Sequence, residues 1–362
     1  MKFKNKCLSR SQRKKLLDQL VPVFPINPFP PVPPPIPQNN CLVFVSNFFS
    51  GTISVFSTSP LENIDTITIG TPFFDTPSGI IYNPNNQRVY ALDETDAELF
   101  IINPFTRQIE ETIQLSQALP TQLIFNPEKD ELYMANLSQN SVTVFDTITN
   151  TETLIVPNIP RATDIAYINN GADTKLYVSN YGQNPPPVTN TVSTIDLGTS
   201  PPTVGSIQVG NLPVGVLYNP NVGRVFVANQ QSQNFSVIDP NTDTVVATIQ
   251  TPGLSPNLTD FNPNTNLLYA ANQSSNPDGT FEVTVIDMVT NQVVTTIPGL
   301  LGNGRDVSID PVRNIIYVSS AAIGSRDGYL TAINGQTNEI IDSDMFPGFD
   351  PSHLVFVPVC TA

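Results

Sequence analysis

The chain has 362 residues, of which 40% are hydrophobic and only 13% are charged, with 35 prolines, 19 glycines and a net charge of −15. This length suits two domains or one repeat array, and the proline and glycine content excludes long helices through most of the chain. The single histidine excludes any site built from two histidine ligands of this chain, and the negative charge argues against nucleic acid as a partner. No stretch approaches the ~20 apolar residues of a membrane span.

The first part of the chain is basic, whereas the rest is acidic. Residues 1–40 carry a net charge of +6, and the remainder carries −21. Residues 1–21 form a basic arm in which 9–20 could form a short helix, and no apolar run follows its basic start as a secretion signal requires. We expect this arm to be flexible, and either solvated or in contact with a partner through residues such as Lys14 and Lys15.

Residues 22–40 are a proline-rich linker or docking peptide. Nine prolines between positions 22 and 37 fix the backbone and remove hydrogen-bond donors, which predicts an extended polyproline II segment. Large apolar side chains alternate with these prolines, and in an inert linker they would be unusual. We therefore expect a protein partner to bind Phe24, Ile26, Phe29 and Ile36.

From residue 41 onward, one phrase recurs seven times. Its copies are LVFVSN from Leu42, RVYALD from Arg88, ELYMAN from Glu131, KLYVSN from Lys175, RVFVAN from Arg224, LLYAAN from Leu267 and IIYVSS from Ile315. Successive copies start 43 to 49 residues apart. A period in the forties with short alternating strands predicts propeller blades of four antiparallel strands.

Each repeat also holds the other three strands of a blade. The strand after the phrase ends in a polar turn, as at Asp146 and Asp287, where the Asp or Asn side chain should cap the turn. A third strand follows. A fourth, such as GIIYNP or GVLYNP, ends in a proline turn and leads into the next blade.

The two ends of the repeat region predict how the ring closes. The chain enters at LVFVSN without an inner strand and ends on one, PSHLVFVP, at residues 351–358. The last strand should therefore complete the first blade, so that residues 41–362 form an all-β, seven-bladed propeller. Because closure removes exposed sheet edges, we expect this body to be monomeric.

The YVSN, FVAN and YAAN phrases with their IDxxT turns resemble the YVTN family of seven-bladed β-propeller repeat proteins. The resemblance covers about residues 41–358, and Asp93 and Ser320 stand where the phrase has Asn. It implies the fold and says little about function. We expect a structural role at the strand end for Asn47, Asn136, Asn180, Asn229 and Asn272.

One ring of inner-strand positions forms the candidate site. Its members, which should line the channel near its mouth, are Gly79, Gln122, Asp164, Gly215, Leu258, Asp306 and His353. Two aspartates and the histidine could form an acid–base or hard-metal site. Since titratable groups spread over seven blades rarely converge, we expect solvated polar residues here, with no catalytic residue, metal or cofactor.

Other motifs for chemistry are missing, and two long loops stand out. There is no nucleophile elbow, P-loop, CxxC or HExxH motif. The acidic segment at residues 93–98 lacks the glycine-centred spacing of a calcium loop, so an exposed polar loop is the better interpretation. Loops 180–190 and 272–282 are rooted on the same face and are either a protein-partner surface or tolerated insertions.

Two of the three cysteines flank the closure of the ring. By the blade alignment, Cys41 and Cys360 correspond to Gln87 and Asn86, which are neighbours at the tip of a hairpin. We expect a disulfide between them, which would imply an oxidising destination, and two free thiols are the alternative. Cys7 is left over and could cross-link to a partner or remain free.

Composition and the first segment bear on location. The surface is poor in charge and rich in Asn, Thr, Ser and Gln, as in proteins exposed outside cells. The segment LVPVFPINPFPPVPPPIP resembles the LVGPTLPPIPPF leader of collagen-like glycoproteins of the Bacillus exosporium, and departs from it at Pro22, Val23 and Phe24. The resemblance implies a cell or spore surface, and a cytoplasmic location is the alternative.

These observations predict a non-enzymatic scaffold or binding propeller, tethered through its N-terminal arm and displayed on a surface. Its partner would be a protein that binds the arm or the two long loops. Two other readings remain open: a lactonase-like hydrolytic propeller, and an intracellular protein-interaction module.

Overall fold

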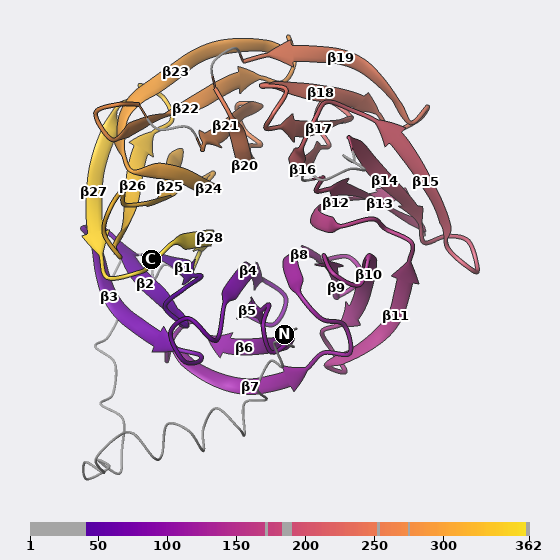
Figure 1. Cartoon of the computed structure of the whole chain (residues 1–362), viewed down its shortest axis with the longest axis horizontal. Coiled ribbons are helices and arrows are strands. Elements are labelled where there is room, and N and C mark those ends of the chain that lie inside the picture. Colours follow the sequence, from indigo (N-terminus) through magenta and orange to yellow (C-terminus); the bar gives the residue numbers. More distant parts are fainter. Residues whose placement is uncertain (1–40, 171–172, 183–189, 252–253, 274–275, 360–362) are drawn as a thin grey trace, which may run out of the picture. The chain divides into compact units, whose positions relative to one another are not determined.

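The computed structural model describes residues 41–170, 173–182, 190–251, 254–273 and 276–359, which belong to one compact unit, residues 36–362. These residues form 28 β-strands, and the described part of the chain contains no helix. The strands make seven four-stranded antiparallel sheets arranged as blades around a central channel (Figure 1). The predicted all-β, seven-bladed propeller is confirmed.

Each blade has an inner, a second, a third and an outer strand, and we number the blades 1 to 7 from the one that contains β1. The inner strands are β28 (Pro351–Val357), β4 (Pro77–Asn83), β8 (Pro120–Asn126), β12 (Ala162–Asn170), β16 (Pro213–Asn219), β20 (Pro256–Asn262) and β24 (Asn303–Asp310). The second strands are β1 (Leu42–Asn47), β5 (Arg88–Asp93), β9 (Glu131–Asn136), β13 (Asp173–Asn180), β17 (Arg224–Asn229), β21 (Leu267–Asn272) and β25 (Ile315–Ala321).

The two remaining positions complete the sheets. The third strands are β2 (Thr52–Thr58), β6 (Glu98–Asn103), β10 (Ser141–Asp146), β14 (Thr191–Asp196), β18 (Asn234–Asp239), β22 (Thr280–Asp287) and β26 (Gly328–Asn334). The outer strands are β3 (Leu61–Thr68), β7 (Gln108–Gln114), β11 (Thr151–Pro157), β15 (Thr203–Gln208), β19 (Thr244–Gln250), β23 (Gln292–Leu301) and β27 (Ile340–Phe346).

Burial explains why the repeated phrase is so apolar. In β5, β9, β17 and β21, five of the six residues are buried, because a second strand has a strand on each side and a blade against each face. The outer strand β7 instead exposes five of its seven residues. The sequence therefore changes from continuous apolar runs near the channel to mixed polar strands at the rim.

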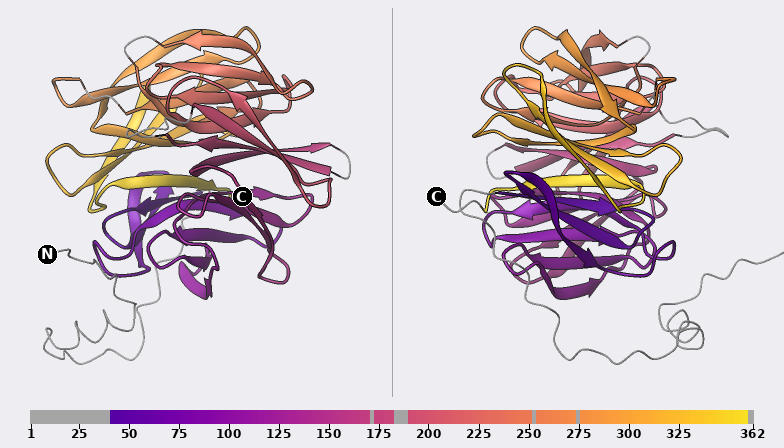
Figure 2. Two further views of the ribbon diagram at one scale, coloured as in Figure 1. Left: turned by 45° about the vertical axis from the view of Figure 1, so that its right-hand side comes forward. Right: turned by 90° about the vertical axis from the view of Figure 1, so that its left-hand side faces the viewer.

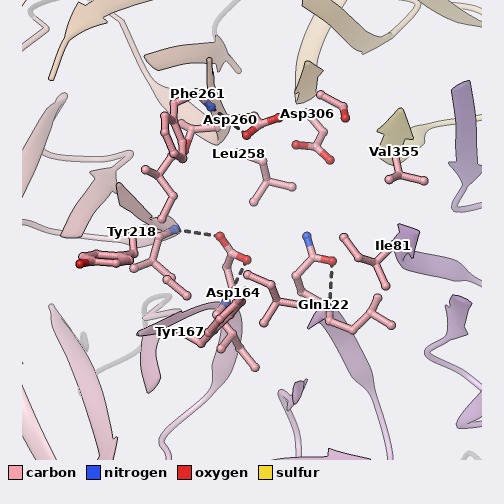
Figure 3. A pocket seen from close by; sticks show the side chains of 18 of the residues that line it. Ile81, Gln122, Asp164, Tyr167, Tyr218, Leu258, Asp260, Phe261, Asp306 and Val355 are labelled. Atoms are coloured by element: carbon pink, nitrogen blue, oxygen red, sulfur yellow. Dashed lines mark hydrogen bonds between the residues drawn. The ribbon is translucent and has the colours of Figure 1, made fainter. Parts of the chain in front are cut away.

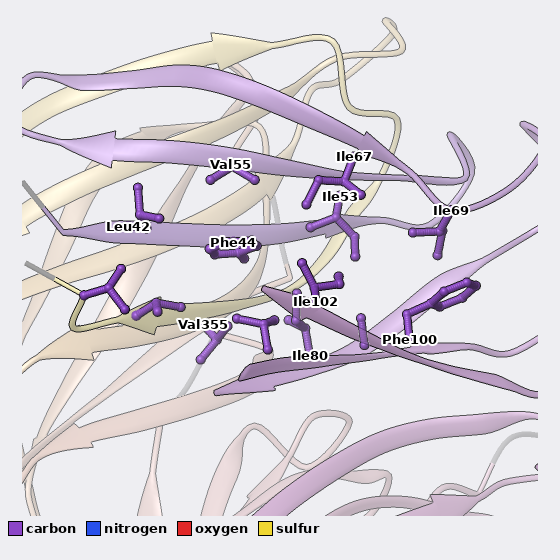
Figure 4. Close-up of a cluster of buried hydrophobic side chains, with 14 residues drawn as sticks. Leu42, Phe44, Ile53, Val55, Ile67, Ile69, Ile80, Phe100, Ile102 and Val355 are labelled. Carbon is purple, nitrogen blue, oxygen red and sulfur yellow. The ribbon is translucent and has the colours of Figure 1, made fainter. Parts of the chain in front are cut away.

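The hydrophobic core lies between the blades. Between blades 1 and 2, Leu42 and Phe44 of β1 pack with Ile80, Phe100 and Ile102 of the next blade (Figure 4). The side chains of β28 join the same cluster through Val355 and Val357. Comparable clusters occur at the other joints of the ring, so burial of apolar surface joins each blade to the next.

The C-terminal strand closes the ring as predicted. In blade 1 the strand order is β28-β1-β2-β3, and β28 pairs with β1 from Leu42 opposite Val357 to Asn47 opposite Pro351. Figure 2 shows the yellow β28 lying beside the indigo strands of blade 1. Strands from the two ends of the body therefore share one hydrogen-bonded sheet.

The asparagine of the repeated phrase bonds across the blade. Asn47 Nδ2 donates to Thr52 Oγ1 at 3.1 Å and to Ser54 Oγ at 2.9 Å, both on the third strand. Asn136 and Asn180 make the same pair of bonds to hydroxyl groups on their third strands. This geometry agrees with the expected structural role and supplies its cause, because a buried amide needs partners.

The body has two faces, which we name by the direction of the inner strands. The inner strands begin on the entry face and end on the exit face, in the proline turns that follow β4, β8, β16 and β20. Since the second strands run antiparallel to the inner ones, the loops that follow them return to the entry face. Loops 180–190 and 272–282 are therefore rooted there.

Candidate functional site

A cavity of about 590 Å³ occupies the central channel, and all seven inner strands contribute to its wall (Figure 3). Four of the seven predicted channel residues line it, namely Gln122 from β8, Asp164 from β12, Leu258 from β20 and Asp306 from β24. The wall also includes Glu128 and Pro220, which follow their inner strands. The cavity therefore extends to the exit face.

Asp164 and Asp306 each bridge two neighbouring inner strands. Asp164 accepts the N–H of the next residue at 2.9 Å and that of Val216 on β16 at 2.8 Å. Asp306 accepts the N–H of its own next residue at 2.7 Å and that of Leu354 on β28 at 3.1 Å. An inner strand has no partner strand on its channel side, so these carboxylates satisfy amides that would otherwise be unpaired there.

Asp260 repeats this arrangement one layer deeper along the channel. Its carboxylate accepts the N–H of the next residue at 2.8 Å and that of Ile309 on β24 at 3.1 Å. Sequence reasoning missed Asp260 because it considered one position per strand. Alternate residues of a strand face the same side, so the residue two places after Leu258 in the predicted ring also faces the channel.

Burial raises the pKa of all three carboxyl groups. The pKa of Asp164 rises to about 7 and that of Asp260 to about 6. The pKa of Asp306 is raised well above its ordinary value by burial and, to a smaller extent, by the charges of the other two aspartates. Asp306 is only 7% exposed, so the expectation of a solvated residue is wrong for it, because its backbone bonds hold it against the wall.

His353 does not join the carboxylates. It occupies the ring position on β28 but is not part of the cavity wall. Its N–H and carbonyl group both bond Ser46 Oγ beside a register shift between β28 and β1. Its buried Nδ1 has no hydrogen-bond partner, and burial lowers its pKa to about 4, which keeps the ring neutral near pH 7. His353 therefore lies outside the cavity wall that Asp164 and Asp306 share.

The glycines of the predicted ring serve close packing of neighbouring strands. A Cβ atom on Gly79 would lie 2.6 Å from Gln122 Oε1 and 2.8 Å from Gln122 Cα on the next inner strand. A Cβ atom on Gly215 would lie 2.9 Å from the carbonyl oxygen of Asn257. Gln122 itself accepts the N–H of its own next residue at 3.0 Å. The mixed residue types at the predicted channel positions thus reflect the contacts that each inner strand makes with the inner strand of the next blade.

The described part of the chain offers no candidate metal site. No group of three acidic, histidine or cysteine side chains there could hold a metal ion. In the acidic segment that follows β5, Asp93 Oδ1 instead caps the turn by accepting the N–H of Thr95 at 2.8 Å. Asp93 is fully buried, so the interpretation as an exposed loop is wrong at this position. Burial raises the pKa of Asp93 to about 6 and that of Glu94 to about 8.

Aromatic side chains that are exposed or partly buried gather on the entry face. We define the aromatic patch as Phe49, Phe73, Phe349 and Arg326. The ring centroids of Phe49 and Phe349 are 5.1 Å apart, those of Phe73 and Phe349 are 5.8 Å apart, and the Arg326 guanidinium lies 5.0 Å from the Phe73 centroid. Phe73 remains 51% exposed.

Backbone hydrogen bonds fix the aromatic patch in place. The N–H of Phe73 donates to the carbonyl oxygen of Phe49 at 2.9 Å, and the N–H of Phe49 donates to that of Phe349 at 3.1 Å. Three loops are thereby joined, one within blade 1 and two that connect blade 1 to its neighbours. Sequence reasoning missed this patch, although the Phe-Phe pairs at 48–49 and 73–74 in loop positions were a signal.

The two long loops are only partly described. At the root of the first, Arg161 Nε donates to the carbonyl oxygen of Tyr181 at 2.6 Å, and the guanidinium lies 5.7 Å from the Tyr181 ring centroid. At the root of the second, Gln230 donates to the side-chain oxygen of Gln273. Residues 183–189 and 274–275 lie outside the described residues.

Several predicted residues cannot be placed. The docking candidates Lys14, Lys15, Phe24, Ile26, Phe29 and Ile36 lie outside the described residues, as does Cys360. Cys41 is 2% exposed and is disulfide-bonded. Its pairing with Cys360 stays a prediction. In the described residues no helix is long and apolar enough to cross a membrane.

The sheets and the channel place this chain in the class of seven-bladed β-propellers. No family model matches it, and no curated protein matches its sequence. The YVTN resemblance and the exosporium-leader resemblance therefore stay hypotheses.

Several solved structures are similar in fold. A functionally unknown protein from Desulfotomaculum acetoxidans aligns over 87% of this chain and 98% of its own, with 15% identity and a TM-score of 0.68. The dihydro-heme d1 dehydrogenase NirN aligns over 92% and 79%, with 12% identity and a TM-score of 0.59. Hydrazine synthase from Kuenenia stuttgartiensis aligns over 63% of this chain and 66% of its own, with 22% identity and a TM-score of 0.54. At these identities the likeness concerns the fold alone.

Proposed function

We propose that this protein is a non-enzymatic binding propeller that holds a protein partner on its entry face. The aromatic patch carries this proposal. The cores of protein interfaces are enriched in aromatic residues and arginine, and an exposed apolar cluster on a soluble protein often marks an interaction site. Phe73, half exposed beneath the Arg326 guanidinium, is the centre of such a cluster.

The rigidity of the aromatic patch supports the same function. Its three loops are fixed by backbone hydrogen bonds before any partner arrives, so little conformational entropy would be lost on binding. Loops 180–190 and 272–282 are rooted on this face and would form the polar rim of the interface.

Attachment at a cell or spore surface through residues 1–40 completes the proposal. The low charge of the chain and the leader resemblance of its proline-rich segment support this location. An intracellular interaction module would use the same patch. Fractionation of cells and spores, with detection of the native protein in each fraction, separates the two locations.

The absence of catalysis is also part of the proposal. Each channel aspartate already accepts two backbone N–H groups, a role that a structural carboxylate performs without chemistry. The hydrolytic alternative requires one of these groups to act on a substrate. A substrate whose turnover falls about a hundredfold in D306N, equal to about 2.7 kcal/mol of barrier, would establish that alternative.

The binding proposal is tested with matched phenylalanine variants. Cross-linking in native cells identifies the partner, and its affinity is then measured for the unmodified protein, F73S, F349S and F105S. Phe105 is 46% exposed and lies in a turn between third and outer strands, on the exit face, which makes F105S the control.

We expect F73S and F349S each to weaken binding by at least about tenfold, equal to about 1.4 kcal/mol, and F105S to leave it unchanged. Unfolding midpoints confirm that each variant is folded. Equal losses in all three variants, or no loss in the patch variants, would refute the assignment of the partner to the entry face.

A further inference from the structure

The wall of the channel cavity carries negative groups without positive ones. Asp164, Asp260 and Asp306 line it, and Glu128 stands where it reaches the exit face. No lysine, arginine or histidine is among the residues of this wall, all of which lie in the described part of the chain. A carboxylate in such a site is costly to ionise unless a positive charge comes close.

These carboxylates are fixed in place. Each accepts one N–H from its own strand and one from the inner strand of the next blade, so the side chain cannot turn away from the channel without breaking both bonds. A carboxylate offers about four acceptor positions, and two of them are used. The others remain available to a donor in the cavity.

The carboxylates stand at two depths of the channel. Asp164 and Asp306 occupy equivalent positions of their strands, whereas Asp260 lies two residues further along its strand. The charges of Asp164 and Asp260 add to the rise in the pKa of Asp306. An elongated molecule with positive charge at both ends would match this spacing in depth.

The rest of the wall suits hydrocarbon. Ile81, Leu258 and Val355 face the cavity (Figure 3). A volume of about 590 Å³ is in the range of small-molecule sites in proteins. A methylene chain would bury apolar surface here.

A metal ion fits the wall less well than an organic cation. Calcium requires six to eight oxygen ligands at about 2.3–2.6 Å, whereas the described residues contain no three-membered group that could hold a metal ion. Separate carboxylates with apolar surface between them match a molecule that combines ammonium groups with a carbon chain.

We propose that the central channel binds a small organic cation, a diamine or polyamine in chemical class, whose ammonium groups pair with Asp164, Asp260 and Asp306. This site is separate from the aromatic patch and does not depend on the proposed protein partner.

The test uses 1,4-diaminobutane as the probe and isothermal titration calorimetry on the full chain in amine-free buffer. The uncharged analogue 1,4-butanediol is the ligand control, because it has the same carbon chain and can form hydrogen bonds. We expect the diamine to bind at about pH 8 and the diol not to bind. At about pH 5, protonation of the carboxylates should lower the affinity for the diamine at least about tenfold.

Variants locate the site. D164N and D306N keep the shape of the side chain and remove its charge, so each substitution should lower the affinity for the diamine at least about tenfold. D146N makes the same change at an exposed turn outside the channel wall and should bind as the unmodified protein does.

Several results would overturn the proposal. They are the absence of diamine binding up to about 10 mM at about pH 8, equal binding of the diol, and equal affinities of D164N, D306N and D146N. Tight binding of Ca²⁺ that the diamine does not displace would also assign the channel to a metal. The comparisons of pH and of diol with diamine use the unmodified protein, so they hold even where a variant fails to fold.

Discussion

The asparagine that ends five of the seven second strands shows how a buried polar side chain is accommodated in this propeller. In blades 1, 3 and 4 it donates to two hydroxyl groups on the third strand. Blade 2 departs from this arrangement, because Asp93 replaces Asn and the residues in the hydroxyl positions are Glu98 and Phe100. Asp93 Oδ2 is buried without a hydrogen-bond partner, so ionisation of this carboxyl group opposes folding.

Asp93 should make the stability of the propeller depend on pH. Its pKa is raised from 3.8 to about 6 by burial, so the folded state holds the proton more tightly than the unfolded state. The contribution of Asp93 to stability therefore falls as pH rises from about 4 to about 6, by on the order of 3 kcal/mol. In D93N this part of the decrease should be absent from the free energy of unfolding measured by denaturant titration.

The control for Asp93 is D146N. Asp146 is exposed, and turn N–H groups hold its pKa below its usual range, so its own titration lies below this window. D146N should leave the decrease between about pH 4 and about pH 6 unchanged. If D93N shows the same decrease as the unmodified protein, Asp93 is not the titrating group.

Strands of neighbouring blades are joined by three kinds of contact. Apolar clusters fill the space between sheets, and channel carboxylates connect adjacent inner strands. An ion pair connects the outer parts of blades 1 and 2, where Arg107 Nε lies 2.9 Å from Asp65 Oδ2. Arg107 is 2% exposed, which distinguishes this pair from the exposed pair of Arg88 and Glu110 within blade 2.

Loss of the buried arginine should weaken the joint between blades 1 and 2. R107A leaves Asp65 without its cation and opens space at the joint, so we expect the free energy of unfolding to fall by about 3–5 kcal/mol. R88A removes an exposed pair and should cost at most about 1 kcal/mol. Denaturant unfolding measures the free energy of unfolding of both variants. Equal losses in R107A and R88A would show that the burial of Arg107 adds no stability to its ion pair.

At the scale of the whole body, the pairing of β28 with β1 closes the ring of blades. β28 is the last strand of the described residues, and it completes the sheet that β1 began. Opening the ring requires loss of the β28–β1 ladder together with the apolar contacts of Val355 and Val357. The stability of every blade therefore depends on a junction between the two ends of the body.

A disulfide between Cys41 and Cys360 should reinforce this junction. Cys41 precedes β1, and Val359, which precedes Cys360, packs in the same apolar cluster as Leu42. Closing a loop of about 320 residues gives up to about 5 kcal/mol in the entropy model. C41S and C360S should each lower the unfolding midpoint under non-reducing conditions.

Peptide mapping without reducing agent tests the pairing directly. We expect a cross-linked peptide that contains Cys41 and Cys360 in protein taken from its native location. A peptide that joins Cys41 to Cys7, or alkylation of both Cys41 and Cys360, would contradict the predicted clasp.

Removal of residues 1–40 should leave the fold intact. The four strands of every blade lie between Leu42 and Val357, so the ring needs no strand from the N-terminal segment. We expect the truncated protein to unfold at nearly the same temperature and to lose its localisation. An insoluble truncated protein, or one that still reaches its native fraction, would show that the segment has another role.

The sequence by itself determined the number of blades, the order of the strands and the closure by the last strand. These features follow from local pattern, because the period of the repeated phrase and the alternation within each strand are visible in the chain itself. The turn caps at Asp146 and Asp287 were predictable for the same reason, since the side chain bonds N–H groups only two and three residues ahead.

Only the tertiary structure decided the site. Alternation along the strand could have placed Asp260 in the channel, but its bond to Ile309 of the next blade and the register shift beside His353 do not follow from the repeat. The aromatic patch likewise joins Phe49 to Phe349, about as far apart as the chain allows within the body. Closing the ring brings these loops together, and the physical reason is that their contacts run between blades, where the period of the sequence carries no information.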